Sequence, residues 1–400
     1  APVGVYGTEN TTYDSISDEL RVTSDFGGAY DFMFGGLYQK SKRNYRNATA
    51  QAGLENSNAP AGYRFVGNSK DSQTRGETLA LFGQIIVRPM DRLELAGGVR
   101  YTHETKDSYF IQPYSNPALA AVFSPGVRLT SNLTFDNWSP EFTIKFEPSD
   151  EVTIYAGYKT AYKSGGFSNS GILGPRASVD DFDFNPEKAS GFEGGIKAQL
   201  MDRQLRLNLG AFWYKYKGMQ IDFFNSPVFA FPTLNAGTAI TKGVEADFQF
   251  APRGAPGFEV HGSLNYNKAN YGRYPDAPCW AGQTIAQGCT RTGTEQGQDL
   301  TGHQLPYNPK WAGMLGFSYD TAMTGTLKVG IDGTAAYSGA YWANTTENPL
   351  ARQDDFWRIN AVIRVHDADD RWEIALIGRN LLNERYGIYL TDKPGGPATG

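Results

Sequence analysis

The sequence lacks any long apolar run. A membrane-spanning helix needs roughly 20 consecutive apolar residues, and no stretch of the 400 residues comes near that length. A helical membrane protein is therefore not expected. The mean hydropathy of −0.45 is hydrophilic. It remains compatible with a membrane protein whose strands turn an apolar side chain to lipid only at alternate positions.

The sequence also lacks a large excess of charge of either sign. The 37 Lys and Arg residues and the 42 Asp and Glu residues are mixed along the chain, and the net charge is −5. No basic cluster marks a nucleic-acid footprint, so no nucleic-acid partner is expected. The first residues, APVGVYGTEN, have neither the charged nor the apolar segment of a signal peptide. We expect either that a signal peptide was removed or that the chain begins part-way through a longer protein.

Catalytic and metal-binding patterns are scarce as well. The stretch GFSNS at 166–170 misses the nucleophile elbow, because a serine stands where the second glycine is required. There is no phosphate-binding loop, and the four histidines stand on separate strands or loops. The acidic run DDFD at 180–183 is interpreted as a solvated loop, with calcium binding as the alternative. We expect no catalytic residue, no metal site and no cofactor, and hence no enzyme.

Cysteine is nearly absent. Cys279 and Cys289 stand close together in a stretch rich in Gly, Pro and Thr. Two cysteines are too few for a disulfide scaffold, and their spacing matches no zinc pattern. A disulfide within a loop, formed in an oxidising compartment, is the favoured interpretation, and two free thiols are the alternative.

The clearest feature that is present is a β-hairpin pattern at 138–167. Apolar residues at 142–146 alternate with polar ones, a polar turn follows at 148–150, and the alternation resumes at 152–162. A period of two places an apolar and a polar set of side chains on opposite faces of a β-ribbon. This pattern is typical of a barrel strand that faces lipid on one side and a wet lumen on the other.

The same hairpin pattern recurs along the chain, and short polar turns alternate with long segments such as 40–76 and 104–137. It predicts an all-β fold, a transmembrane antiparallel β-barrel of up-and-down hairpins with about fourteen strands. We expect a single barrel region over 1–400, with strands from about 17 to 386 and a final extracellular loop at 387–400.

Aromatic residues divide by position. Those near strand ends on the apolar face are expected to form an interfacial girdle: Tyr101, Tyr158, Trp213, Tyr266 and Tyr337. Those in the long loops are candidates for ligand contact, since functional residues concentrate in loops over a rigid scaffold: Phe167, Phe223, Phe224, Phe229, Phe231, Tyr341 and Trp342. The alternative is that the second set packs the loops together.

Four motifs, in order along the chain, resemble the barrel of TonB-dependent outer-membrane receptors. They are YAGYK at 155–159 followed by KSGGF at 163–167, NPEK at 185–188 followed by FEGGIK at 192–197 and a DR turn at 202–203, LPYNPKW at 305–311, and NLLNERY at 380–386. The resemblance implies a barrel of the larger, plugged kind. It also implies that the plug domain, the TonB box, the early strands and the last strand are missing from this chain.

The resemblance implies a function in TonB-dependent uptake of a scarce nutrient, such as an iron chelate, cobalamin or a glycan, in the outer membrane of a Gram-negative bacterium. The expected partners are outer-membrane lipid, a small nutrient ligand, and TonB through the missing plug region only. Two alternatives stay open: a passive outer-membrane channel of about fourteen strands, and a secreted all-β binding protein. Nothing in the sequence selects one substrate.

Overall fold

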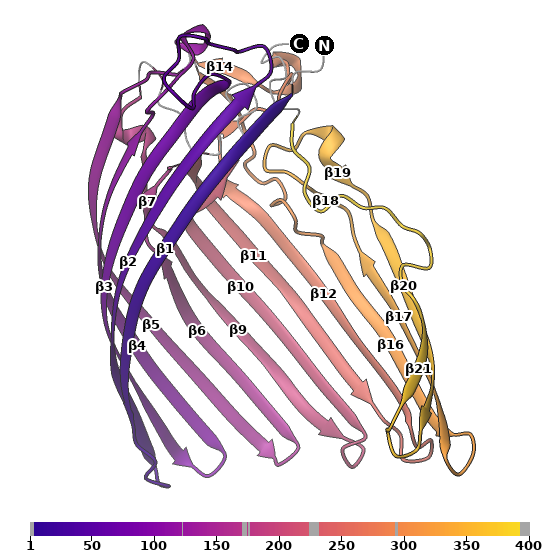
Figure 1. Cartoon of the computed structure of the whole chain (residues 1–400). Helices are drawn as coiled ribbons and strands as arrows, with labels where there is room; N and C mark the ends of the chain where they lie inside the picture. Colours follow the sequence, from indigo (N-terminus) through magenta and orange to yellow (C-terminus); the bar gives the residue numbers. More distant parts are fainter. Residues whose placement is uncertain are drawn as a thin grey trace.

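A single antiparallel sheet organises the molecule. The computed structural model describes residues 4–121, 123–169, 174, 177–223, 232–292 and 295–392. Within them, a 14-stranded sheet has the order β1-β2-β3-β4-β5-β6-β9-β10-β11-β12-β16-β17-β20-β21. The strands are tilted, and the sheet curves like the wall of a barrel (Figure 1). The predicted all-β architecture of successive hairpins is therefore confirmed.

The strands of this sheet, called the wall below, are β1 (Val5–Thr23), β2 (Tyr30–Gln51), β3 (Val66–Met90), β4 (Leu93–Ile111), β5 (Arg128–Ser149), β6 (Val152–Lys163), β9 (Glu187–Leu200), β10 (Leu205–Asp222), β11 (Thr233–Phe250), β12 (Phe258–Arg273), β16 (Trp311–Ala322), β17 (Leu327–Ser338), β20 (Phe356–Asp367) and β21 (Glu373–Gly378). Short strands in the connections are β7 (Gly166–Phe167), β8 (Asp183–Phe184), β13 (Ala277–Pro278), β14 (Thr290–Thr292), β15 (Glu295–Gln298), β18 (Tyr341–Trp342) and β19 (Arg352–Gln353). Single 3-10 turns are η1 (Pro117–Leu119), η2 (Val179–Asp181), η4 (Ile285–Gln287) and η5 (Pro349–Ala351). None of the helices in the described chain has the length and apolar character to cross a membrane.

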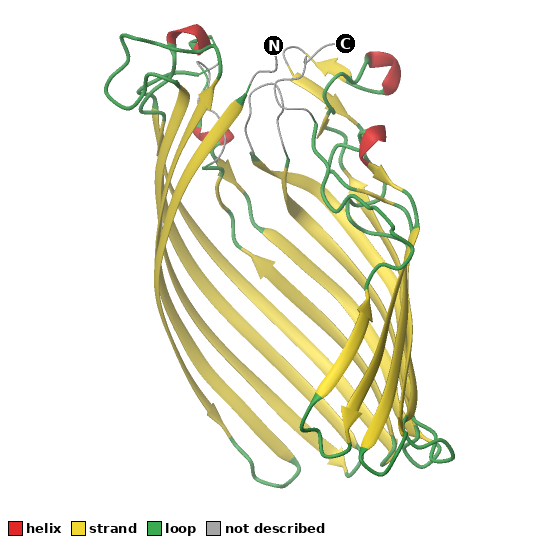
Figure 2. Cartoon of the chain, turned by 45° about the vertical axis from the view of Figure 1, so that its right-hand side comes forward, coloured by secondary structure: helices red, strands yellow, loops and turns green. Residues whose placement is uncertain are grey.

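Short and long connections lie at opposite ends of the wall. The short ones, such as 91–92 and 150–151, form what we call the turn end. The long ones, such as 274–310, form with the adjoining strand ends what we call the rim. Figure 2 shows the rim at the top, where the helical turns lie, and the turn end at the bottom. This separation confirms the alternation of short turns and long loops that the sequence predicts.

The outer face of the wall is apolar and exposed. Alternate residues along each strand turn large apolar side chains outward, among them Leu81, Phe142, Leu209, Leu315, Ile331 and Ile363. Near the rim, aromatic rings pair across neighbouring strands. Ring centroids are 4.9 Å apart for Tyr101 and Trp138, 5.1 Å for Tyr158 and Phe192, 4.7 Å for Tyr266 and Trp311, and 5.0 Å for Tyr337 and Trp357. A belt of this kind suits the boundary between lipid and water.

The inner face carries charges that pair with one another. The Lys159 ammonium lies 2.6 Å from a Glu193 carboxylate oxygen, and the Tyr214 hydroxyl donates to the same carboxylate at 2.7 Å. Near the turn end, Arg88 contacts Asp31 at 2.6 Å and Glu94 at 3.1 Å. These pairs make the inner face polar, as expected for a wet lumen rather than a packed core.

Several strands are longer than the sequence analysis predicts. β1 begins at Val5 rather than near residue 17, and the expected long segment at 40–76 is mostly strand. The segment at 104–137 likewise contains the end of β4 and the start of β5. The physical reason is that these extensions continue the backbone ladder beyond the apolar band, as with Thr12 opposite Asn44. With both faces polar there, no apolar period marks the strand.

At the other end of the chain, the last strand is shorter than predicted. β21 ends at Gly378, whereas strand was expected to about residue 386. Asn380 turns the chain, with φ of 49°, in the left-handed region that asparagine tolerates better than most residues. Its side chain accepts a hydrogen bond from the Glu384 N–H at 3.0 Å and donates to the Glu384 carbonyl at 2.9 Å. This local hydrogen bonding replaces a strand ladder.

Candidate functional site

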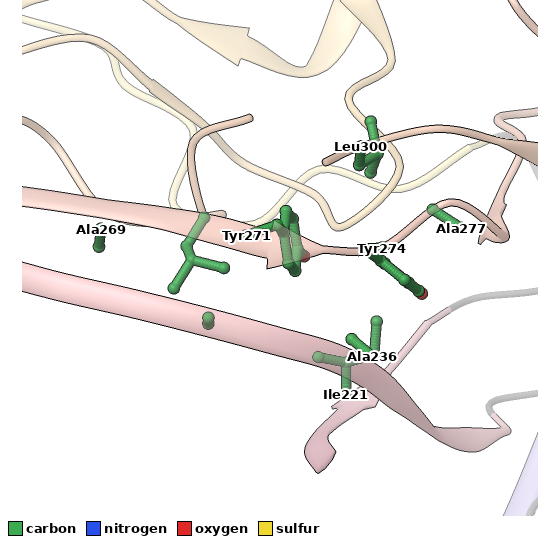
Figure 3. Packing of buried hydrophobic residues seen from close by; sticks show 9 residues of the cluster. Ile221, Ala236, Ala269, Tyr271, Tyr274, Ala277 and Leu300 are labelled. Carbon is green, nitrogen blue, oxygen red and sulfur yellow. The ribbon is translucent and has the colours of Figure 1, made fainter. Parts of the chain in front are cut away.

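The rim has its own buried apolar cluster. It gathers the ends of β10, β11 and β12 with the connection that follows β12, through Ile221, Ala236, Ala239, Ala269, Tyr271, Tyr274, Ala277, Leu300 and Leu305. Figure 3 shows these side chains around the end of β12. The rings of Tyr271 and Tyr274 lie 5.0 Å apart. Apolar side chains that are excluded from solvent in this way hold the rim together as they hold a water-soluble domain.

Backbone hydrogen bonds fix the connection over this cluster. The Tyr271 N–H donates to the His303 carbonyl, and the Leu305 N–H donates to the Ala269 carbonyl, both at 2.9 Å. Further out, β13, β15 and β14 form a three-stranded sheet. A disulfide joins Cys279 to Cys289 there, with the Cα atoms 5.8 Å apart. The connection is therefore a folded platform rather than an extended loop.

Beside this platform lies a cavity of about 360 Å³. Its walls come from segments far apart in the sequence: Asp222, Phe223, Tyr307, Asn344, Thr345, Thr346, Tyr389, Leu390, Thr391 and Asp392. We call it the rim pocket. Its volume lies within the range of small-molecule sites in proteins.

Hydrogen bonds from the surrounding rim hold the walls of the rim pocket. The Leu390 N–H donates to the Ala343 carbonyl at 2.9 Å, and the Tyr307 N–H donates to the Trp342 carbonyl at 2.8 Å. The Asp392 carboxylate accepts from the Ala281 N–H at 2.7 Å. The pocket is therefore preformed and tied to the platform that carries the disulfide.

Two tyrosines define one side of the rim pocket. The rings of Tyr307 and Tyr389 stack with centroids 6.4 Å apart. Burial, reinforced by Tyr389 and Tyr341, raises the pKa of Tyr307 to about 12. Burial and then the negative charge of Asp222 raise the pKa of Tyr389. Both phenols therefore remain neutral at physiological pH, and the charge of the described lining comes from its two carboxylates.

The loop aromatic residues that the sequence predicts as ligand contacts separate into four groups. Phe223 lines the rim pocket. Tyr341 and Trp342 support its surroundings, since the Tyr341 hydroxyl donates to the Gly387 carbonyl at 2.9 Å and the guanidinium carbon of Arg352 lies 5.1 Å from the Trp342 ring centroid. The other candidates on the β10–β11 connection lie outside the described residues: Phe224, Phe229 and Phe231.

Phe167 belongs to a different part of the rim. Its ring stacks on that of Phe182 at 5.2 Å, and Phe182, which is 1% exposed, stacks on Phe110 at 6.1 Å. The contacts join two parts of the β6–β9 connection to the end of β4. Packing of this kind is the alternative to ligand contact that the sequence left open for the loop aromatics. Phe182 also shows that the DDFD run at 180–183 is anchored by a buried ring rather than fully solvated.

Most residues that line the rim pocket carry no signal in the sequence. Asn344 and the two aspartates were not selected, because single polar residues in long loops carry no pattern. Tyr307 was noticed only as part of a motif. The backbone of Tyr307 turns the chain between Pro306 and Asn308 with a φ of 58°. A tyrosine in this left-handed conformation is unusual and draws attention to a functional site, but it is visible only in the structure.

No group of three or more His, Cys, Asp or Glu side chains that could hold a metal ion occurs in the described parts of the chain. The four histidines instead each contact one or two acidic residues. His103 contacts Asp136, and His303 contacts Glu347 at 2.8 Å.

A family model described as "TonB dependent receptor-like, beta-barrel" matches residues 2–381. The chain belongs to this family of TonB-dependent receptor barrels. Among curated relatives, the pesticin receptor of Yersinia pestis is 22% identical over 327 residues, which cover 80% of this chain and 41% of that protein. The pesticin receptor of Yersinia enterocolitica is 26% identical over 186 residues, which cover 46% of this chain and 25% of that protein.

Solved structures show the same fold. The ferric yersiniabactin uptake receptor of Yersinia pestis has a TM-score of 0.73 and 17% identity, covering 96% of this chain and 51% of that one. A siderophore receptor of Acinetobacter baumannii has a TM-score of 0.67 and 16% identity, covering 97% and 55%. The chain thus spans about half the length of these solved receptors. Their fold is that of the wall, which the sequence resemblance had implied.

A TonB-dependent receptor barrel lies in the outer membrane of a Gram-negative bacterium, and the apolar outer face of the wall suits that place. Outer-membrane barrels turn their short connections to the periplasm and their long ones outward. The turn end of this receptor barrel therefore faces the periplasm. The rim, with its pocket, faces the outside of the cell.

Proposed function

We propose that this receptor barrel takes up a scarce nutrient across the outer membrane and that the rim captures the nutrient from outside the cell. It acts as a transport receptor rather than an enzyme. TonB acts through a plug region that lies outside residues 1–400. An iron chelate is the first candidate substrate, because relatives with this fold are named for ferric yersiniabactin uptake and for siderophores. Cobalamin and glycans are the other candidates.

The observation that carries this proposal is the rim pocket within a barrel of this family. The pocket lies beyond the membrane band, and its walls are preformed by hydrogen bonds that hold Leu390 and Tyr307. A preformed, partly apolar concavity with a few polar groups is the usual form of a small-molecule site. Beneath it, the inner face of the wall is polar, as a route for a hydrophilic nutrient requires.

The secreted all-β protein that the sequence left open does not fit the wall. A water-soluble protein rarely exposes a continuous apolar surface of this extent, since such a surface aggregates. Here the exposed apolar side chains follow one face across neighbouring strands, as with Leu315 and Ile363. We therefore keep only the two membrane functions, active receptor and passive channel, for the experiment to separate.

The test is uptake of radiolabelled iron, supplied as ferric yersiniabactin, by cells that produce the complete protein. Cobalamin and an oligosaccharide are measured in the same way. We expect accumulation of one of them in cells with TonB and none in cells without it. Equal accumulation with and without TonB would establish a passive channel instead. Failure to accumulate any of the three would overturn uptake of these nutrients.

A pair of tyrosine variants assigns the uptake to the rim. Tyr389→Ala removes a ring from the rim pocket and should lower uptake by about tenfold, the loss expected for one aromatic contact. Tyr319→Ala removes an exposed ring near the turn end, where it contacts Phe258. Uptake should remain at the unsubstituted level in this control. Equal losses in the two variants would contradict capture at the rim.

A further inference from the structure

One polar atom in the rim pocket has no partner within the protein. The Asn344 side chain is 7% exposed and lines the cavity, yet its Oδ1 accepts no hydrogen bond from the protein. A buried acceptor without a donor is costly, so native structures almost always satisfy such an atom with protein, water or ligand. Because Asn344 lines the rim pocket, we infer that a ligand in this cavity supplies the missing donor when the side chain adjusts to it.

The charge of the described lining is negative. Among the described residues that line the rim pocket, Asp222 and Asp392 are charged, and neither Lys nor Arg is present. Their described hydrogen-bond donors are neutral. Thr233 Oγ1 donates to Asp222 at 2.5 Å, and Asn348 Nδ2 donates to Asp392 at 2.6 Å. These bonds hold the carboxylates in place without cancelling their charge.

The remaining walls are aromatic. Phe223, Tyr307 and Tyr389 provide ring surfaces beside the carboxylates. Aromatic faces attract cations and stack on flat apolar groups. An anion in the same place would meet two carboxylates and the negative faces of the rings. The described lining of the rim pocket therefore favours a cation over an anion.

We propose that the rim pocket binds a neutral or positively charged group that donates hydrogen bonds and carries an aromatic or apolar face, and that it rejects anions. This inference rests on the proposed function, because it assigns the chemical class of ligand to the same rim. It selects cationic or neutral, donor-rich nutrients over anionic iron chelates. A metal ion alone is not the ligand proposed, since the described acidic side chains form no metal-binding group here.

Three indoles that differ in charge test the inference on the unsubstituted complete protein. They are tryptamine (cationic), 3-methylindole (neutral) and indole-3-propionate (anionic), titrated separately into the protein in detergent by isothermal titration calorimetry. The cation should bind about tenfold to a hundredfold more tightly than the anion, the range for a hydrogen bond to a charged group, with the neutral compound between them. Equal affinities, a preference for the anion, or no binding of tryptamine would overturn the inference.

Variants locate the preference in the rim pocket. The double variant Asp222→Asn and Asp392→Asn keeps the shape and removes both charges, so the preference for tryptamine over indole-3-propionate should fall to about threefold or less. Asn344→Ala removes the unpartnered acceptor and should weaken tryptamine binding while keeping the preference over the anion. Asp369→Asn, an exposed aspartate near the turn end, is the matched control and should change neither value. An unchanged preference in the double variant would place the discrimination elsewhere and overturn the assignment.

The outcomes separate this inference from the proposed function. TonB-dependent uptake of an anionic iron chelate through the rim pocket would contradict the charge preference and still establish the receptor. Preference for tryptamine without TonB-dependent uptake of any nutrient would support the pocket chemistry and contradict active transport. The two hypotheses therefore fail independently.

Discussion

Leu315 in the wall and Tyr271 in the rim are both large side chains with apolar surface, yet 56% of Leu315 is exposed and only 2% of Tyr271. The same contrast occurs along a single strand. In β12, Leu264 on the outer face is 52% exposed, whereas Ala269 and Tyr271, further toward the rim and on the opposite face, are buried. An outer side chain of the wall meets lipid, and an inner side chain of the rim is covered by the connection that follows β12.

In the wall, lipid surrounds the apolar side chains of the outer face, so their exposure carries no free-energy cost. In the rim, water surrounds the protein, and apolar side chains gather inward as in a soluble domain. The wall is therefore held by its backbone ladder and its membrane. The rim is held by its own packing, as Figure 3 shows around Tyr271. A substitution that destabilises the wall should leave the rim largely intact, and a substitution that destabilises the rim should leave the wall largely intact.

The largest expected effect comes from the rim cluster. Tyr271→Ala leaves a cavity beside Tyr274 and should lower the free energy of rim opening by about 3–5 kcal/mol, as for other large aromatic-to-alanine changes in cores. Hydrogen exchange measures this at the amides of Leu300 and Leu305, which are bonded over the cluster. Wall amides, such as that of Ile331, should keep their protection.

Tyr271→Phe is the matched control, because the Tyr271 hydroxyl has no hydrogen-bond partner in the protein. It keeps the ring and should change rim opening by less than about 1 kcal/mol. Equal loss of protection in the wall and the rim of the alanine variant would show that the two regions unfold together, against the comparison above.

The next largest effect concerns the lipid face. Leu315 lies midway along β16, between the aromatic pair at Trp311 and that at Tyr319. Leu315→Arg should destabilise the protein folded in lipid vesicles by about 2–4 kcal/mol, the cost of a cation near the bilayer midplane. Urea unfolding in vesicles measures it.

Ser263→Arg provides the comparison on the inner face. Ser263 lies opposite Met314 in the ladder, one step from the pair formed by Gly262 and Leu315. An arginine there meets the polar interior and should cost less than about 1 kcal/mol. Similar costs for both arginines would mean that the two faces of the wall do not differ in solvent.

The same contrast of solvents explains which features the sequence predicts. A period of two is visible only where one face meets lipid and the other meets a polar interior, as along β16. The wall was therefore predicted, including its alternation of short and long connections. Beyond the apolar band both faces of β2 and β3 are polar, so residues 40–51 gave no strand signal although they are paired.

The rim pocket was beyond prediction for a different reason. Its lining is assembled from the end of β10 and the residue after it, the β12–β16 and β17–β20 connections, and the segment after β21. No local pattern links Asp222 to Asn344 or Tyr389, because their proximity depends on how the long connections fold over one another. Phe223 was selected only because aromatic residues in loops form a general class of ligand contacts. Loop folding, rather than strand pairing, makes this site.

Removing the disulfide is expected to have an intermediate effect, confined to the rim. Cys279 and Cys289 are separated by 10 residues, and closing a loop of that length contributes about 2–3 kcal/mol. The double variant Cys279→Ser and Cys289→Ser should lose that much stability in the platform only, measured as faster proteolysis between β13 and β15. Reductant should have the same effect on the unsubstituted protein and none on the double variant. A loss of wall stability on reduction would contradict a separate rim.

The smallest expected effect lies at the turn end, where neither lipid nor a packed core determines the energy. Met201, Asp202 and Arg203 all adopt left-handed backbone conformations, with φ of 57°, 54° and 68°. This conformation costs about 1–2 kcal/mol for most residues, but asparagine tolerates it. Met201→Asn should therefore stabilise the protein by less than about 1 kcal/mol, measured by urea unfolding in vesicles.

Met323→Asn is the control for this gain. Met323 is exposed in the turn between β16 and β17, as Met201 is between β9 and β10, but its backbone is not left-handed. Replacing it should bring no stabilisation, since there is no strain to relieve. A gain of the same size in both variants would trace the effect to the removal of an exposed methionine. A gain at Met201 alone, with rim exchange unchanged, would show that the turn end contributes to stability through backbone conformation, independently of the packing that holds the rim.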